Sequence, residues 1–324
     1  MASLLNDLDW NQLLKRIREG NCTPFLGAGV NFGTLPLGKQ IAQEWAASHD
    51  YPLDDSYDLA RVSQYLALTG PDRVYPKSLL LEKFEEKYEE MFKNRAFPDF
   101  NDANNPLGVL ADLPLPIYIT TNYDDFMFRA LKAKGKDPKV ELCAWNQVLQ
   151  EQAAVSYTEP TFSATGKADP ASIKVKSFAP SLLSSASNFE PTPRSPVVYH
   201  LHGHYQLIES MVLTENDYLD FLVNMSKDQK LLPSRIKYSL TAASLLFMGY
   251  SLADPNFRVL FRGLIYPMAE YRRLSISIQL PPSERAQGYL TKYFDDMRFK
   301  VCWSKAEDFV TELSERWTKF SSGG

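Results

Sequence analysis

The segment YHLHGH at residues 199–204 holds three of the four histidines of the chain, His200, His202 and His204. If the backbone stays extended there, side-chain alternation places the three imidazoles on one face. Gly203 ends the extended run and leaves His202 at its tip. A neutral imidazole near pH 7 accepts a proton from water or from a ribose hydroxyl, so we expect His202 to be a general base. A three-histidine metal site is the alternative, but the sequence offers no carboxylate or Cys partner at ligand spacing.

Polar residues gather again at Thr121, Asn122 and Asp124, directly after an apolar run that begins at Ile117. Side chains at the carboxyl end of a buried strand point into the crevice where open α/β sheets bind ligands. The amide of Asn122 could hold a carboxamide, a ribose hydroxyl or a water, and Asp124 could hold a hydroxyl. Asn122 and Asp124 are also good helix caps, so they could cap a helix that begins near Asp125. The two roles are compatible.

Glycines dominate the turn that follows the first apolar run, where Gly27, Ala28, Gly29 and Val30 lead to Gly33. Glycines let a backbone approach a pyrophosphate, whose charge is met by N–H groups and by the next helix N-terminus. The spacing G-x-G-x-x-x-G is one residue longer than the common dinucleotide fingerprint. We expect the first four of these residues to contact a dinucleotide, and a plain glycine-rich turn is the alternative.

A fourth segment again follows an apolar run and opens a predicted helix. Its Gly249 and Ser251 could contact a ribose or a phosphate. Asp254 could bind the same ligand, or it could cap the helix with Pro255 at the favoured first position.

Six short apolar runs supply the strands that position these residues. Each has about four to seven residues and is largely continuous in apolar character, which is typical of parallel strands buried on both faces. Helical periodicity between them, as at 125–132 and 256–268, predicts an α/β fold with a Rossmann-like, doubly wound parallel sheet. The runs begin at Thr23, Ile117, Val197, Leu245, Ser275 and Phe299.

Two stretches interrupt this alternation and suggest the domain organisation. Residues from about 40 to 112 are helical and charged, which predicts a helical subdomain inserted after the first strand. Residues from about 150 to 196 are rich in Ser, Ala, Thr and Pro, which predicts a flexible loop. We expect an N-terminal helix over 1–20, a ligand-binding core over 21–310 and a C-terminal helix end and tail over 311–324.

Composition excludes several classes of protein. The 324-residue chain has a net charge of −4, so we expect no direct binding to nucleic acid. Its three cysteines are far apart and form no CxxC pair, which fits a reducing cytoplasm and argues against a zinc ribbon. No stretch approaches the roughly 20 apolar residues that span a bilayer, and the amphipathic N-terminus is no signal peptide, so we expect a cytoplasmic protein without membrane contact.

Taken together and in chain order, the four motifs resemble those of the sirtuin superfamily. The likeness covers roughly residues 20–305. The spellings TTNYD and GYSLxDPN are closer to the sirtuin-like NAD hydrolases of bacterial anti-phage defence than to protein deacylases. The matching segments are Gly27–Val30 for the GAG loop, Thr121–Asp124 for TQNxD, His202-Gly203 for the catalytic His-Gly, and Gly249–Leu252 for GxSL.

Departures from the deacylase pattern point the same way. Deacylase sirtuins carry a four-cysteine zinc module after the catalytic histidine, whereas only Cys302 follows His202 here. Their Gly-Ile-Pro-Asp-Phe-Arg segment is replaced by Thr-Leu-Pro-Leu-Gly at 34–38. The resemblance therefore implies NAD as substrate, no zinc, and no ready binding of an acyl-lysine.

The resemblance also implies a mechanism. Nicotinamide leaves the ribose, and hydrolysis yields nicotinamide and ADP-ribose. Asn122 would orient the ribose, the carboxamide or the attacking water, His202 would be the general base, and Asp124 would give orienting or electrostatic support. In the family, uncontrolled NAD loss stops the metabolism of an infected cell, which is abortive infection.

Such an activity must be controlled, and the core takes up almost the whole chain. We therefore expect a homo-oligomer or a separate activator or sensor, for which the family offers a DNA-translocase ATPase, an Argonaute-type protein or a phage protein. Two other functions stay open at this point. One is a non-catalytic module that binds NAD or ADP-ribose and serves assembly; the other is an NAD-dependent protein deacylase.

Overall fold

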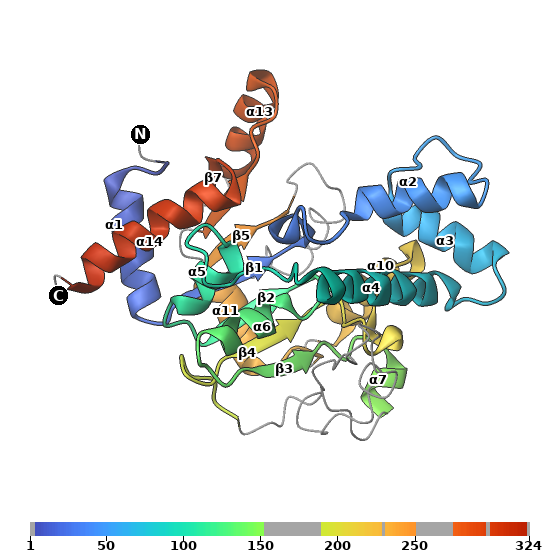
Figure 1. The fold of residues 1–324 in the computed structure, drawn as a ribbon, viewed down its shortest axis with the longest axis horizontal. Coiled ribbons are helices and arrows are strands. Elements are labelled where there is room, and N and C mark those ends of the chain that lie inside the picture. The colour runs from blue at the N-terminus through green and yellow to red at the C-terminus, as the bar shows by residue number, and fades with distance from the viewer. Residues whose placement is uncertain (1–3, 152–188, 229–230, 251–274, 296–298, 323–324) are drawn as a thin grey trace.

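The computed structural model describes residues 4–151, 189–228, 231–250, 275–295 and 299–322 (Figure 1). Within these residues one seven-stranded sheet runs in the order β3-β4-β2-β1-β5-β6-β7, and every neighbouring pair is parallel. The strands are β1 (Cys22–Leu26), β2 (Ile117–Thr120), β3 (Lys139–Leu142), β4 (Val197–His200), β5 (Ser244–Met248), β6 (Ser275–Gln279) and β7 (Phe299–Trp303).

Six of these strands lie in the predicted apolar runs, and their burial explains the pattern. Every residue of β1, β2, β4, β5 and β6 is buried, as in a parallel sheet covered on both faces. The two edge strands, β3 and β7, are less buried, and β3 lacks the apolar pattern because its sequence KVEL contains two charges. Lys139 is exposed, and the buried Glu141 pairs with Arg235 of α11 (Ser234–Thr241).

Helices cover both faces of the sheet, which confirms the doubly wound α/β prediction. One face packs against α1 (Asp7–Arg18), α5 (Pro106–Asp112), α6 (Phe126–Ala133) and α14 (Ala306–Ser322). The other packs against α10 (Glu215–Lys227), α11 and α13 (Glu284–Asp295), with the short α7 (Gln147–Glu151) nearby. Side chains of β1 alternate between the two cores, since Leu26 lies in the first and Phe25 in the second.

The segment between β1 and β2 is helical. After the 3-10 helix η1 (Ala28–Asn31) come α2 (Gly38–Ser48), α3 (Leu59–Thr69), α4 (Tyr75–Asn94) and then α5. Helices α2 and α3 stand away from the sheet (Figure 1) and share with the first half of α4 a separate core that includes Trp45 and Leu66. Tyr88 and Met91, in the second half of α4, join the core of the sheet instead. Helix α4 therefore links the helical subdomain to the sheet.

Helices near the two ends of the chain pack together on one face of the sheet (Figure 1). Trp10 of α1 stacks on Phe309 of α14, with ring centroids 5.2 Å apart. The expected core boundary at residue 310 falls inside α14, whose Phe309, Val310 and Leu313 are buried. None of the helices in the described ranges combines the length and apolar character needed to cross a bilayer.

Several predictions from sequence fall where the structure gives no description. Most of the predicted loop at about 150–196 and the predicted helix at 256–268 lie outside the described residues. So do Ser251 and Asp254, two of the residues expected to bind the ligand.

Candidate functional site

The loops that follow β1 and β5 meet at the centre of the sheet. The Gly27 N–H donates to the Met248 carbonyl at 2.9 Å, and the Gly29 N–H donates to the Gly249 carbonyl at 2.9 Å. From β1 the chain goes to β2 on one side, and later to β5 on the other. The carboxyl ends of β1 and β5 therefore form the topological switch point, where open α/β sheets bind ligands.

Close packing between two backbones explains the glycines at this point. A Cβ on Gly249, whose φ is +80°, would lie 2.4 Å from both the Gly27 carbonyl oxygen and the Val30 nitrogen. A Cβ on Gly27 would in turn lie 2.8 Å from the Gly249 oxygen. The N–H groups of Gly27, Gly29 and Val30 already donate within the protein. The alternative of a packed glycine turn thus describes the contacts present, and dinucleotide binding by Gly27, Ala28, Gly29 and Val30 stays a prediction.

A tyrosine that sequence reasoning did not select joins three strand ends. The Tyr250 hydroxyl donates to the Leu26 carbonyl at 2.9 Å and lies 2.6 Å from the Thr121 hydroxyl. Thr121 also donates its N–H to Leu26 at 3.0 Å. The ring of Tyr250 lies against Gly27, where a Cβ would come within 3.0 Å of it. From sequence, we expected its neighbours Gly249 and Ser251 to contact the ligand. No spacing rule indicated a role for the tyrosine between them.

Asn122 connects the segment after β2 to the glycine turn. Its side-chain nitrogen donates to the Gly27 carbonyl at 3.2 Å, and its backbone N–H donates to the Thr120 hydroxyl at 2.9 Å. The residue is 9% exposed, and its Oδ1 has no hydrogen-bond partner among the described residues. Gly27, Thr121, Asn122 and Tyr250 thus form a hydrogen-bonded cluster at the strand ends. A buried acceptor without a donor costs free energy, so the Asn122 Oδ1 is the atom of this cluster best suited to receive a donor from a ligand.

Asp124 binds the first turn of α6, although the N-cap residue of that helix is Asp125. The Asp124 Oδ1 accepts the N–H of Phe126, the first residue of α6, at 3.0 Å. Its Oδ2 accepts the side-chain amide of Asn31 at 2.7 Å, and both side chains are buried. Burial raises the pKa of Asp124 from 3.8 to about 7, although these hydrogen bonds oppose the shift. Asn31 could have been found from sequence as the one strongly polar residue in the apolar stretch after the glycines.

The predicted arrangement of the three histidines is wrong. Strand β4 ends at His200, and Gly203 turns the chain with a φ of +86°. A Cβ at Gly203 would lie 2.2 Å from the Ser210 oxygen, so glycine is required there. The rings of His200 and His204 pack edge to face with centroids 4.8 Å apart.

His202 lies on the α10 side, away from the ring pair of His200 and His204. Its ring makes edge contacts with Tyr218 at 5.3 Å and Phe221 at 5.2 Å. Among the described residues, no group of three potential metal ligands is clustered. Because β4 ends at His200 and Gly203 turns the chain, the segment does not stay extended, and the three imidazoles do not share one face.

The environment of the His202 ring fixes its protonation. Burial lowers its pKa from 6.5 to about 3, so the imidazole is neutral at physiological pH. Its Nε2 is buried and has no hydrogen-bond partner among the described residues. The backbone is held in place, because the His202 carbonyl accepts the Val212 N–H at 2.9 Å. His202 therefore has a buried ring nitrogen that is only a weak base.

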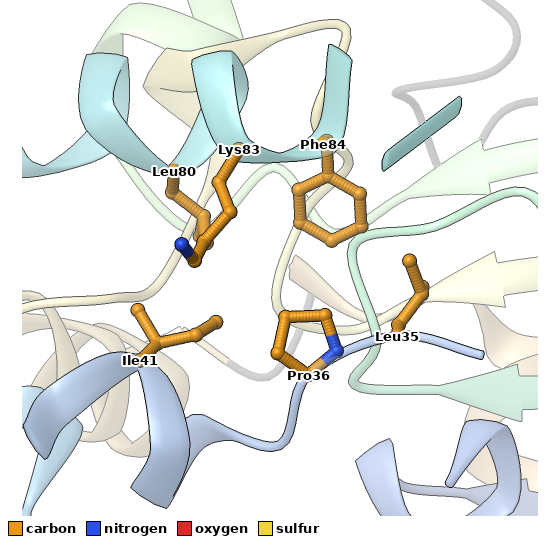
Figure 2. A pocket seen from close by; sticks show the side chains of 6 residues that line it. All are labelled: Leu35, Pro36, Ile41, Leu80, Lys83 and Phe84. Carbon is orange, nitrogen blue, oxygen red and sulfur yellow. The ribbon is translucent and has the colours of Figure 1, made fainter. Parts of the chain in front are cut away.

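A small, mostly apolar pocket adjoins the segment after the glycine turn (Figure 2). Leu35 and Pro36 form one side, and α2 and α4 of the helical subdomain form the others. At its edge the Lys83 ammonium pairs with Glu44 at 2.6 Å. The lining residues are Leu35, Pro36, Ile41, Leu80, Lys83 and Phe84.

Together, the sheet order and the helices on both faces define a Rossmann-like, doubly wound α/β protein, and the bonded strand ends lie where such sheets bind ligands. More specifically, the chain belongs to the SIR2-like family, whose domain model matches residues 116–301. This match confirms the resemblance to sirtuin-like proteins, and it covers the segments that hold Asn122, His202 and Gly249.

Among curated proteins, the chain is similar to several that are named NAD(+) hydrolase ThsA. The protein from Enterococcus faecium is 21% identical over 313 residues, which are 95% of this chain and 54% of that protein. The one from Cytobacillus dafuensis is 22% identical over 298 residues, 91% of this chain and 48% of that protein. The one from Bacillus cereus (strain MSX-D12) is 25% identical over 248 residues, 75% and 39% of the two chains. The chain thus spans about half the length, or less, of these relatives.

Among solved structures, a Sir2 enzyme aligns over 98% of this chain and 100% of its own, with 14% identity and a TM-score of 0.40.

Proposed function

We propose that this chain is an NAD glycohydrolase that cleaves the bond between nicotinamide and ribose to give nicotinamide and ADP-ribose. The observation that carries the proposal is the cluster at the switch point. There Asn122 is bonded to Gly27 through its amide nitrogen and keeps a buried, unpartnered oxygen among the described residues. Membership in the SIR2-like family and the similarity to proteins named NAD(+) hydrolase support the same reading.

For this reaction, the protein needs to position the reactants and to stabilise the developing charge. As the C1′–N bond breaks, its electron pair returns to the nicotinamide ring, and positive charge develops at the ribose. A water oxygen then bonds to C1′ and loses a proton. We assign Asn122 Oδ1 to accept a hydrogen bond from a ribose hydroxyl or from this water, which fixes the reacting geometry.

His202 would accept the proton in this scheme. Its neutral Nε2 is in the correct state to do so, and its low pKa makes proton transfer inefficient unless the developing charge of the substrate assists. Asp124 has both oxygens engaged by Asn31 and Phe126, so it would act by holding the glycine turn and α6.

The remaining predicted contacts are assigned to the dinucleotide. We propose that the pyrophosphate lies along Gly27, Ala28, Gly29 and Val30. Thr121 and Gly249 border the ribose, together with Ser251 and Asp254 of the segment that the structure does not describe. Because the Gly27 and Gly29 N–H groups donate to strand β5 and its loop, these two glycines would shape the surface more than bind the phosphates directly.

The biological role proposed for this activity is depletion of NAD during anti-phage defence, which stops the growth of an infected cell. We propose that the activity is controlled by homo-oligomerisation or by a separate activator. An ATPase that translocates on DNA, an Argonaute-type protein or a phage protein would fit. The partner with the most direct support is NAD itself, because the relatives are named for it.

One observation favours a second function, a non-catalytic module that binds NAD or ADP-ribose. The general base assigned above is buried between aromatic rings, and that burial lowers its pKa to about 3. A site with a weak base could bind the dinucleotide without turning it over.

Nicotinamide release by wild type, Asn122→Ala and His202→Ala decides between the two functions. Tyr118→Phe is a suitable control, because Tyr118 donates to the Leu110 carbonyl at 2.9 Å within the core of the sheet. Hydrolysis predicts release by wild type and control, with losses of about 100-fold or more in both site variants. Stoichiometric NAD binding by wild type without release, under all activating conditions tried, would establish the binding module instead.

A further inference from the structure

His200 makes a contact that neither the family match nor the assignments above explain. It is the last residue of β4, is 1% exposed, and lies in register with Thr120 of β2. Its Nδ1 is 3.0 Å from the backbone carbonyl oxygen of Asn122. A carbonyl only accepts, so Nδ1 carries the hydrogen and donates it.

This bond completes a set of three around Asn122. The Asn122 N–H donates to Thr120, its carbonyl accepts from His200, and its side-chain nitrogen donates to Gly27. Asn122 lies beyond the end of β2, so no strand ladder fixes its backbone. The first two bonds hold the peptide groups on both sides of its Cα, which in turn directs the carboxamide toward the glycine turn.

The surroundings of His200 keep this donor in place. Burial lowers the pKa of His200 from 6.5 to about 4, against the opposing effects of the bond to Asn122 and the charge of Asp125. The ring is therefore neutral at physiological pH and carries one N–H. The His204 ring packs against it at 4.8 Å and restricts its rotation.

We infer that His200 is a positioning residue for NAD hydrolysis, which acts through its hydrogen bond to the Asn122 carbonyl. The inference rests on the proposed function, in which His200 acts through Asn122 and is assigned no contact with the substrate or the reacting atoms. Loss of this hydrogen bond should lower kcat more than it changes KM. A misdirected Asn122 oxygen weakens stabilisation of the transition state more than binding of the dinucleotide.

Two substitutions of nearly equal shape separate positioning from packing. Asn at position 200 places an N–H donor where Nδ1 stood, and Leu has the same branching without a donor. We expect His200→Leu to lower kcat for nicotinamide release by about 10- to 100-fold, with the KM for NAD changed less than about threefold. We expect His200→Asn to recover kcat to within about fivefold of wild type. Tyr118→Phe removes a buried bond to the Leu110 carbonyl, which belongs to α5 and not to the bonds around Asn122, and it should leave both constants unchanged.

The outcomes are distinct. Equal kcat for His200→Leu and His200→Asn, with similar melting temperatures, would overturn the inference, because the donor would then be irrelevant. Equal losses that track melting temperature would also overturn it, since His200 would only be packing. Wild type that neither binds NAD nor releases nicotinamide would withdraw the proposed function, and the inference with it. A kcat difference between the two folded variants, at constant KM, is the result that supports positioning.

Discussion

Asn31 and Asp124 form a buried hydrogen bond of 2.7 Å between the turn after β1 and the segment after β2. The same carboxylate accepts the N–H of Phe126 and so begins α6. Asp124 therefore joins a helix, a strand end and the glycine turn within one side chain. Because it is buried beside Asp125, its pKa is raised to about 7, and its charge changes near physiological pH.

Replacement of Asp124 by Asn should change how stability depends on pH. The native state prefers the protonated carboxyl, so its stability is complete near pH 4 and is lost as pH rises to about 7. Asp124→Asn has no such loss. We expect the unfolding free energy of the variant to gain on wild type by roughly 1 kcal/mol per pH unit from pH 5 to 7, and then to level off. Urea unfolding at pH 5, 6, 7 and 8 measures this.

The control for that series is Asp137→Asn. Asp137 is exposed and bonded to Lys132, which lowers the pKa of its carboxyl. Asp137 therefore stays ionised from pH 5 to 8. The difference in unfolding free energy between Asp137→Asn and wild type should be the same at every pH. A constant difference for Asp124→Asn as well would show that its carboxyl does not titrate in the native state near neutral pH.

Gly249→Ala should be costly because the loops after β1 and β5 touch there. The new Cβ would lie 2.4 Å from two backbone atoms of the glycine turn, and φ is +80°. We expect a loss of about 3 kcal/mol or more in unfolding free energy, together with loss of nicotinamide release. Gly135→Ala is matched in backbone angle, at +71°, but nothing lies within 4 Å. It should cost only roughly 1–2 kcal/mol. Similar losses at both positions would mean that the close approach is unimportant.

Sequence reasoning found the strands with continuous apolar character, since burial on both faces requires that pattern. It missed β3, because a strand with Lys139 and Glu141 looks polar until Arg235 is known to neutralise the buried charge. That partner is distant in the chain, and no local rule connects them.

The candidate site shows the same division. Asn122 and the glycine turn meet as the ordered motifs suggested, because parallel strands bring their carboxyl ends to one edge. The histidines differ from the prediction because alternation holds only while the chain is extended, and β4 ends at His200. Gly203 indicated a turn in the sequence. The sequence did not indicate how many residues lie between the end of the strand and that turn.

The buried pair of Glu141 and Arg235 should respond differently to single and double substitution. Burial raises the pKa of Glu141, and the nearby guanidinium opposes that shift. Glu141→Ala leaves Arg235 without its carboxylate at a site where the Glu141 side chain is 1% exposed. We expect a loss of about 3–5 kcal/mol. The double variant Glu141→Leu, Arg235→Leu should recover most of it in chemical unfolding. If the double variant is as unstable as the single one, the charge pair is not what makes the single change costly.

His202→Phe should make the protein less sensitive to acid. The His202 pKa is about 3 in the folded chain and near 6.5 in the unfolded one, so its contribution to stability is full above pH 6.5. That contribution is lost as pH falls toward 3, because the unfolded state then binds a proton that the native state excludes. Phe fits beside Tyr218 and Phe221 and does not titrate. From pH 6.5 to 5, the variant should gain about 2 kcal/mol on wild type.

The measurement is the slope of unfolding free energy against pH, with Tyr118→Phe as the control that removes a buried polar group but no group titrating in this range. This slope reports how many more protons the unfolded state binds than the native state. That number should fall by about one in His202→Phe and stay unchanged in the control. An unchanged slope in His202→Phe would mean that the imidazole can be protonated in the native state. It would then be open to solvent and a much stronger base than its packing implies, which would favour the hydrolase over the binding module.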